Sequence, residues 1–323
     1  MALVKDRTID ALLPAEMAVR AEEIGVSKAN MGLFATFALG VLAGIFIALG
    51  AVFATTVTAP NLTVGVSTGA PLASSLPFGI AKVLAGLTFC LGLILVVVAG
   101  AELFTGNNLI VMAWANGQIT TRRLLRNWGI VYLGNFVGAI LTVLVVLLSG
   151  QYTFGNGAVG LNALNIAQTK VGYGFIQAVF LGSLGNMLVC LAVWLVFSAR
   201  TTTDKILSII FPITAFVAAG FEHSIANMYF VPMGLLIKLA ASVTFWGDIG
   251  KTAMDYGSLT WGAFFLRNLL PVTIGNIVGG AGGVGVVYYV IYLRGKARVT
   301  SPLMAPNEDV DAFISTPHTL SKL

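Results

Sequence analysis

Six long apolar runs, separated by shorter polar stretches, dominate the order of hydrophobic and polar positions along this chain. Each run is long enough to supply the roughly 20 residues that an α-helix needs to cross the hydrocarbon core of a membrane. The runs extend from about Leu33 to Val57, Phe78 to Ala113, Trp128 to Ser149, Phe175 to Phe197, Ile206 to Ile237 and Leu269 to Leu293. The pattern predicts an all-α polytopic membrane protein with six transmembrane spans.

The second and fifth runs are too long for one simple span, and both contain glycine and polar residues near the middle. Lipid cannot satisfy the hydrogen bonds of irregular backbone, so such inserts are tolerated only where protein buries them or where they line a cavity. We therefore expect spans 2 and 5 to be broken helices.

Composition supports the membrane assignment and excludes other classes of protein. Hydrophobic residues make up 57% and charged residues 10% of the 323, and the mean hydropathy is +0.92, which no ordinary soluble domain shows. Most Lys and Arg residues flank the apolar runs, so the net charge of +5 indicates topology rather than a nucleic-acid partner. Cys90 and Cys190 lie inside apolar runs and are interpreted as small hydrophobic residues, so we expect no disulfide, metal or cofactor.

Polarity divides the chain into an N-terminal segment 1–30, a six-span domain 31–295 and a polar tail 296–323. Pro14 can begin and Gly25 can end a short amphipathic helix, which either lies on the membrane surface or covers a pore mouth. Lys and Arg are concentrated in the N-terminal arm, the second and fourth loops and the tail, so both termini are predicted to be cytoplasmic. The loops Thr55 to Pro77 and Lys238 to Asn268 are then external, although the second of them carries basic residues.

Two motifs of the first half of the chain recur in the second half. Ala99 to Asn107 matches Ala219 to Asn227, with Ala, Gly, Glu and Asn in register, and Gly134 to Gly138 matches Gly275 to Gly279. Three spans in each half require that the halves insert in opposite directions, which is the inverted-repeat plan of many transport proteins. In that plan the two broken helices meet near the membrane midplane.

The polar side chains of the two inserts are therefore expected to face a central pathway. They are Glu102, Thr105 and Asn107 on one side and Glu222, His223, Ser224 and Asn227 on the other. Ionisable groups at this depth usually mark a path for substrate, ions or protons, although each glutamate could instead hold the freed amides of its own broken helix. His223 is the candidate for chemistry, because Leu103 stands at the matching position of the first half.

Three stretches, Gly100 to Asn107, Gly185 to Ala192 and Gly220 to Met228, resemble the signature sequences of the formate/nitrite transporter family. The resemblance extends from about Leu13 to Leu293 and is greatest to the formate channels of the family. It implies an aquaporin-like fold, six spans in each protomer, a homopentamer with one pore in each protomer, and a location in the bacterial cytoplasmic (inner) membrane. The long loop from Thr55 to Pro77 and the pair Gly106 and Asn107 depart from the family pattern.

The resemblance also implies roles for individual residues. Leu103 to Asn107 becomes a flexible loop that places Thr105 opposite His223. Lys170 becomes a basic residue near the external approach, and Asn186 and Asn276 become polar groups near the pathway. The apolar side chains that narrow the pore are implied to be Phe89, Leu93, Leu103, Phe104 and Phe216, for which ordinary helix packing is the alternative.

The predicted function is passage of formate. A bare carboxylate in an apolar constriction costs many kcal/mol, so neutralisation is the usual escape, and imidazole exchanges its proton near neutral pH. We hypothesise that Lys170 attracts formate, and that His223, oriented by Thr105 or Glu222, lends or relays a proton. The solute then crosses as formic acid or as an anion that is partly neutralised in place. The expected partners are small monovalent anions, protons and membrane lipid.

Other functions stay open at this point. Nitrite and hydrosulfide share the small size and charge of formate. A neutral-solute channel of the aquaporin type is disfavoured, because the chain contains no Asn-Pro-Ala pair. An enzyme is not expected either, because the only other histidine, His318, lies in the tail and the chain has no His-Glu-x-x-His motif.

Overall fold

The computed structural model describes residues 11–64 and 71–295, so the predicted tail 296–323 and residues 1–10 of the predicted N-terminal segment lie outside the described residues. The α-helices are α1 (Pro14–Asn30), α2 (Leu33–Val57), α3 (Phe78–Leu95), α4 (Val111–Ala115), α5 (Thr121–Leu148), α6 (Ala158–Gly172), α7 (Phe175–Ser198), α8 (Thr202–Ala218), α9 (Ser224–Ala240), α10 (Val243–Ile249), α11 (Trp261–Ala263), α12 (Leu270–Ile277) and α13 (Val287–Tyr292). Strands β1 (Asn61–Val64) and β2 (Pro71–Ser74) form an antiparallel hairpin.

Most of the helices lie where the apolar runs predict spans. Five helices in the described ranges are long and apolar enough to cross a membrane, and the bent pair of α9 and α10 would make a sixth. The last span runs from α11 to α13 through the π-helical segments Phe264–Leu269 and Val278–Val286. The predicted fifth span is divided between α8 and α9, each of 17 residues.

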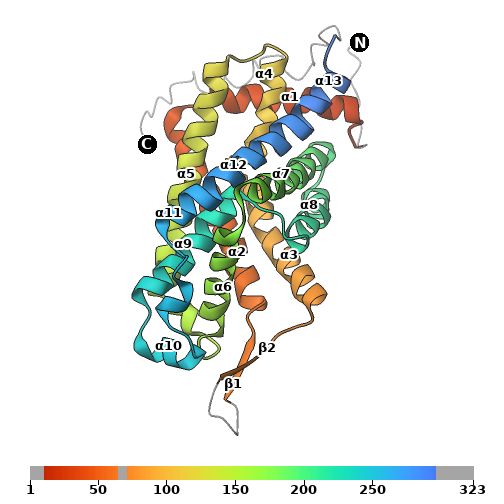
Figure 1. The fold of residues 1–323 in the computed structure, drawn as a ribbon. Helices are drawn as coiled ribbons and strands as arrows, with labels where there is room; N and C mark the ends of the chain where they lie inside the picture. The colour runs from red at the N-terminus through yellow and green to blue at the C-terminus, as the bar shows by residue number, and fades with distance from the viewer. Residues whose placement is uncertain (1–10, 65–70, 296–323) are drawn as a thin grey trace, which may run out of the picture.

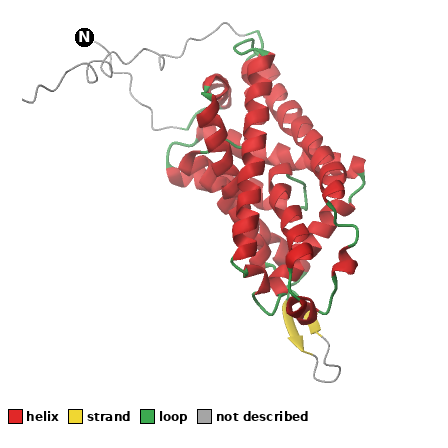
Figure 2. Ribbon diagram, turned by 90° about the vertical axis from the view of Figure 1, so that its left-hand side faces the viewer, coloured by secondary structure: helices red, strands yellow, loops and turns green. Residues whose placement is uncertain are grey.

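The long helices run between two ends of the molecule, which differ in what they carry (Figures 1 and 2). The terminal end, at the top of Figure 1, carries α1, α4 and α13. The hairpin end, at the bottom, carries the β1–β2 hairpin and α10. A pathway through the molecule would connect these two ends.

Each half of the chain contains a pair of helices that cross at glycines of the repeated motif. In the first half α2 packs against α5, and Gly138 lies against the carbonyl oxygen of Val41. In the second half α7 packs against α12, and Gly279 lies against the carbonyl oxygen of Ser183. A Cβ atom at either glycine would overlap backbone atoms, so these close crossings require glycine. The halves meet where α3 packs against α8, which agrees with the predicted 3+3 inverted repeat.

The N-terminal helix is longer and more deeply packed than the sequence indicated. Gly25 does not end α1, which continues to Asn30 and packs Gly25 against Ile110 and Ala113. Met17, Ala18 and Ala21 are also buried. The helix therefore covers the protein at the terminal end instead of resting freely on a membrane surface.

Two loop predictions need correction. The predicted external loop from Lys238 to Asn268 ends too late, because the last span begins at Trp261 and already includes the buried Asn268. The stretch between the third and fourth spans, to which the sequence assigned no helix, contains α6. Helix α6 precedes α7 as α1 precedes α2, so the inverted repeat extends beyond the six spans.

Candidate pore and its two broken helices

Both broken helices end in the same backbone geometry. The π-helical turn Val96–Gly100 that continues α3 ends at Gly100 with φ of 86°, and Gly220 follows α8 with φ of 74°. These left-handed conformations strain any residue with a Cβ atom. The repeated glycines therefore stop the two helices at matching positions.

An asparagine holds the freed backbone in each break. Asn135 accepts from the amide N–H of Phe104 at 3.0 Å and donates to the carbonyl oxygens of Gly40 and Glu102. The Phe104 N–H and the Glu102 carbonyl are backbone groups that the broken helix leaves without helical partners, whereas Gly40 belongs to the neighbouring helix α2. A single side chain from α5 thus satisfies two groups of the break and ties them to α2.

The same arrangement recurs in the second break. Asn276 accepts from the amide N–H of Ser224 at 2.9 Å and donates to the carbonyl oxygens of Gly182 and Glu222. Asn276 therefore serves as a brace, and it does not line either of the two cavities described below. Its predicted place near the pathway is correct only in the sense that it holds the backbone beside it.

The glutamate of the first break belongs to a buried network of four residues. Lys28 of α1 contacts Glu102 at 2.9 Å and also donates to Asn107. Asn107 donates to Glu102 at 2.7 Å and to Asn127 at 3.0 Å, and Asn127 donates to the carbonyl oxygen of Lys28. The Glu102 carboxylate therefore binds side chains, and not the freed backbone amides that the sequence analysis offered as an alternative partner.

The second break repeats this network almost bond for bond. Lys170 of α6 donates to Glu222 at 2.8 Å, Asn227 donates to Glu222 at 2.6 Å and to Asn268 at 2.8 Å, and Asn268 donates to the carbonyl oxygen of Lys170. Glu222 therefore binds these residues, and of the two side chains offered as alternatives for orienting His223 it is Thr105 that contacts the ring. Lys170 is held in an ion pair, and its expected attraction for formate stays a prediction.

His223 lies at the N-terminus of α9 and contacts the opposite half of the chain. Its Nε2 lies 2.9 Å from the Thr105 hydroxyl oxygen, and its Nδ1 accepts from the amide N–H of Ala226 at 3.1 Å. His223 is 2% exposed and Thr105 is fully buried. The structure thus brings together Thr105 and His223, which are 118 residues apart, as the sequence predicted.

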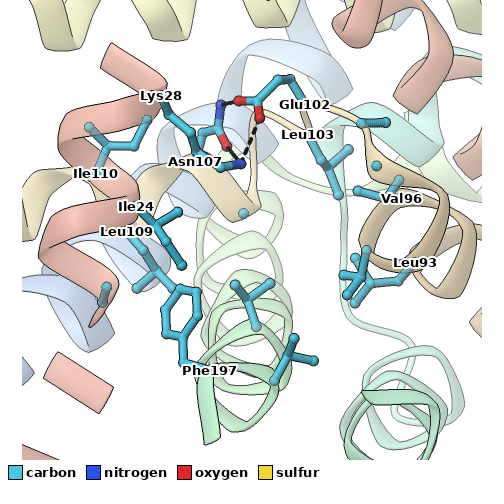
Figure 3. A pocket seen from close by; sticks show the side chains of 18 of the residues that line it. Ile24, Lys28, Leu93, Val96, Glu102, Leu103, Asn107, Leu109, Ile110 and Phe197 are labelled. Carbon is cyan, nitrogen blue, oxygen red and sulfur yellow. Dashed lines mark hydrogen bonds and ion pairs between the residues drawn. The ribbon is translucent and has the colours of Figure 1, made fainter. Parts of the chain in front are cut away.

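A cavity of about 390 Å³ opens at the terminal end. It is lined by α1, by the end of α3, by the first break and by the end of α7 (Figure 3). Figure 3 shows Lys28, Glu102 and Asn107 joined at one side, whereas apolar side chains such as Leu93, Leu109 and Phe197 surround the rest. We call this cavity the terminal vestibule.

A second cavity, of about 350 Å³, opens at the hairpin end. It is lined by residues from α2, α3, α6, α8, α9 and the second break, including Lys82, Lys170 and His223. We call this cavity the hairpin vestibule. The Thr105–His223 contact joins the linings of the two cavities, since Leu103 and Gly106 on either side of Thr105 border the terminal vestibule and His223 borders the hairpin vestibule.

Four of the five apolar side chains predicted to narrow a pore border one of the two vestibules, and Phe104 is the exception. Leu93 borders the terminal vestibule, whereas Phe89, one helical turn away on α3, and Phe216 border the hairpin vestibule. The rings of Phe89 and Phe216 lie 6.0 Å apart, edge to face. Phe104 borders neither vestibule, because its ring packs against Tyr132 at 4.9 Å and against Trp128 on α5.

Asn186 of α7 contacts the backbone of Thr105, whose hydroxyl contacts His223. Its side chain donates to the backbone carbonyl oxygens of Asn276 at 2.7 Å and Thr105 at 3.3 Å. The Cys190 thiol also donates to the carbonyl oxygen of Thr105. Asn186 and Cys190 therefore hold the backbone that presents the Thr105 hydroxyl to His223.

Comparison with known proteins identifies the chain. Residues 15–290 match the formate/nitrite transporter family. The chain belongs to this family. It is 50% identical over 289 residues to the formate channel FocA of Escherichia coli strain K12, which covers 90% of this chain and 97% of that protein. It is 45% identical over 276 residues to FocA of Haemophilus influenzae, covering 85% and 93%.

Solved structures agree with this assignment of the transporter chain. A pentameric formate channel with formate bound matches with a TM-score of 0.73 and 45% identity, covering 81% of this chain and 98% of that one. An ion channel of the formate/nitrite transporter family matches with a TM-score of 0.64 and 26% identity, covering 86% and 98%. The resemblance on which the predicted fold rested is therefore confirmed.

Sequence reasoning missed several residues of the two networks in this family member, although a signal was present. Asn127 and Asn268 each lie eight positions before the asparagine of the repeated Gly-Asn motif. Extending that alignment toward the N-terminus would have paired them, although the same offset of 141 places Lys28 against Thr169, one residue before Lys170. In the part of the chain that the structure describes, no cluster of His, Cys, Asp or Glu residues could hold a metal ion.

Proposed function

We propose that this chain carries formate across the bacterial cytoplasmic membrane through a pore in each protomer of a homopentamer, with both termini in the cytoplasm. The relatives named as formate channels support the substrate, and the solved pentameric relative supports the assembly. The pore would run from the hairpin vestibule past the Thr105–His223 contact into the terminal vestibule. The proposed function is transport without a catalysed reaction.

The observation that carries the proposal is the geometry of His223 between two vestibules. Its Nδ1 accepts from the amide N–H of Ala226, so the neutral ring carries its proton on Nε2. Nε2–H then donates to the Thr105 hydroxyl oxygen, which leaves the hydroxyl proton free to donate to another acceptor. A small anion at this point therefore meets a hydrogen-bond donor in an otherwise apolar passage.

These hydrogen-bond donors compensate for part of the hydration free energy that the anion loses when it leaves water. An unpaired carboxylate in an apolar environment costs many kcal/mol, whereas hydrogen bonds to a charged group are among the strongest in proteins. Formate crosses either as an anion stabilised by Thr105 and His223 or as formic acid after it takes up a proton. Phe89, Leu93 and Phe216 restrict the passage to small solutes.

The test records two signals from the same liposomes after a formate jump. Anion passage produces an electrical current on a solid-supported membrane, whereas passage of formic acid acidifies the liposome interior without a current. His223→Asn keeps a side chain that can cap α9 but removes the imidazole. We expect this change to reduce the pH-dependent part of formate transport by about 100-fold or more, from the lower end of the range of general acid–base contributions upward.

An unchanged rate and an unchanged pH dependence in His223→Asn would contradict the role of His223. A competition series with nitrite, hydrosulfide, acetate and glycerol tests the substrate. A larger response to nitrite or hydrosulfide would leave the proposed pore standing and replace formate as the proposed substrate. A response to glycerol alone would indicate a neutral-solute channel. If intact protein gave no current and no acidification with any of these solutes, the proposed transport function would be rejected.

A further inference from the structure

The hairpin vestibule contains one cation without an acidic partner. Its charged lining residues are Lys82, Lys170 and Glu222. Lys170 and Glu222 form an ion pair at 2.8 Å, so their charges largely cancel at a distance. Among the described residues, no carboxylate lies within ion-pair distance of Lys82, whose ammonium lies 5.4 Å from the centroid of the exposed Phe78 ring.

Among residues 11–64 and 71–295, the lining of the terminal vestibule has no such excess of charge. Its charged lining residues are Lys28 and Glu102, and they form an ion pair at 2.9 Å. The two vestibules are therefore alike in carrying one Lys–Glu pair, and they differ by the single positive charge of Lys82. The inverted repeat supplies the paired charges, whereas Lys82 is specific to the hairpin side.

The position of Lys82 within α3 is not explained by helix stability. Helix α3 begins at Phe78, so Lys82 lies in the first turns, and no side chain caps the N-terminus. The helix dipole gives a cation in the second turn no stabilisation, because its effect falls off within the first turn and its N-terminal end is positive. The helix end and the ammonium group instead add to the same positive potential at the mouth of the hairpin vestibule.

We infer that Lys82 concentrates small monovalent anions, such as monocarboxylates, in the hairpin vestibule and so raises the rate at which they reach His223 from that side. The inference rests on the proposed function. It assigns to Lys82 the attracting role that the sequence assigned to Lys170. A charged cleft with apolar walls can raise association rates by about 10-fold to 1,000-fold, and the effect falls with ionic strength.

The experiment changes the charge at one position of the full-length chain. Lys82→Cys is reconstituted and compared after modification with a positively charged, a neutral or a negatively charged methanethiosulfonate reagent. Initial formate transport is measured at about 10 mM and about 1 M salt, where the Debye length falls from about 30 Å to about 3 Å. At low salt we expect the neutral form to be about three- to tenfold slower than wild type, the negative form slower still, and the positive form to recover most of the rate.

Two controls make the result specific. Wild type treated with the same reagents reports on Cys90 and Cys190, which are buried. Lys251→Cys places the same chemistry at an exposed residue beyond α10 that does not line the hairpin vestibule, and there the three labels should change the rate less than about twofold. Recovery by the positive label also shows that Lys82→Cys is folded.

The outcomes separate the two hypotheses. Wild type that conducts formate, together with Lys82→Cys rates that do not depend on label charge at low salt, would overturn the inference and leave the proposed function intact. Charge-dependent rates that persist unchanged at high salt would also overturn it, since attraction at a distance must be screened. Wild type that does not conduct formate would reject the proposed function itself.

Discussion

The two broken helices are almost identical in their hydrogen bonds and different in one side chain that touches the pathway. Both use a left-handed glycine, a bracing asparagine and a network of lysine, glutamate and two asparagines. At the matching position one break carries Leu103 and the other His223, whose imidazole reaches Thr105 of the first break. The comparison indicates that the shared residues maintain the broken backbone, whereas the unmatched histidine is available for chemistry.

The helices that follow the two breaks also differ. After the first break the chain continues in the 3₁₀ turn Gly106–Ile110 and the five-residue α4, with no side-chain cap at Thr105. After the second break it enters the 17-residue α9, whose first turn His223 caps. A side-chain acceptor at this position satisfies an amide that a helix N-terminus otherwise leaves open. His223 thus serves the fold with Nδ1, and in the proposed function it serves the pathway with Nε2.

The largest expected effect compares the two glutamates. Glu222→Ala should lower the free energy of unfolding by about 3–5 kcal/mol, because it leaves Lys170 as an unpaired buried cation. Glu102→Ala should cost less, about 1–3 kcal/mol, because the Lys28 side chain is 28% exposed against 13% for Lys170 and can regain water. Thermal unfolding in detergent measures both.

The matched control replaces both members of the inner pair. Lys170→Met combined with Glu222→Met should recover much of the loss of Glu222→Ala, because the double change leaves no isolated charge. Equal losses in Glu222→Ala and Glu102→Ala would show that burial of the lysine does not distinguish the two breaks.

The next effect separates a packing phenylalanine from a pore phenylalanine. Phe104→Ala should destabilise the protein by about 3–5 kcal/mol without admitting larger solutes, because its ring packs against Tyr132 and Trp128. Phe216→Ala enlarges the hairpin vestibule and should raise the acetate rate relative to formate by about tenfold. Relative rates in liposomes, measured beside unfolding midpoints, distinguish the two. Acetate passage in Phe104→Ala alone would return that residue to the constriction.

The smallest effect makes the second break resemble the first. His223→Leu should cost about 1 kcal/mol of stability through loss of the α9 cap, whereas His223→Asn should retain most of it. The difference between their unfolding midpoints isolates the Nδ1 hydrogen bond from the chemistry of Nε2. Equal midpoints would mean that His223 contributes nothing as a cap.

Much of this fold was predictable because membrane spans are encoded locally. Apolar length gave the spans, and the repeated Gly-Glu and Gly-Asn motifs gave the two breaks and the inverted halves. Helix α6 and the start of the last span at Trp261 were missed. Buried polar residues, such as Asn268 in the last span, interrupt the apolar runs from which the spans were predicted. The candidate pore was predicted less completely, since four of its predicted residues bind or pack against other residues of the protein. They are Glu222, Lys170, Asn276 and Phe104.

By itself, therefore, the sequence determined the class of protein, the positions of the spans and the meeting of the two polar inserts, because hydropathy and repetition are properties of the chain. The pairing of Thr105 with His223 was implied only by the resemblance to the family. Only the tertiary structure decided which charges act at a distance. Lys170 and Lys82 are both lysines near the hairpin vestibule, and nothing in their local sequence shows that one is paired with Glu222 and the other is not. A charge is cancelled by neighbours in space, and these neighbours come from distant parts of the chain.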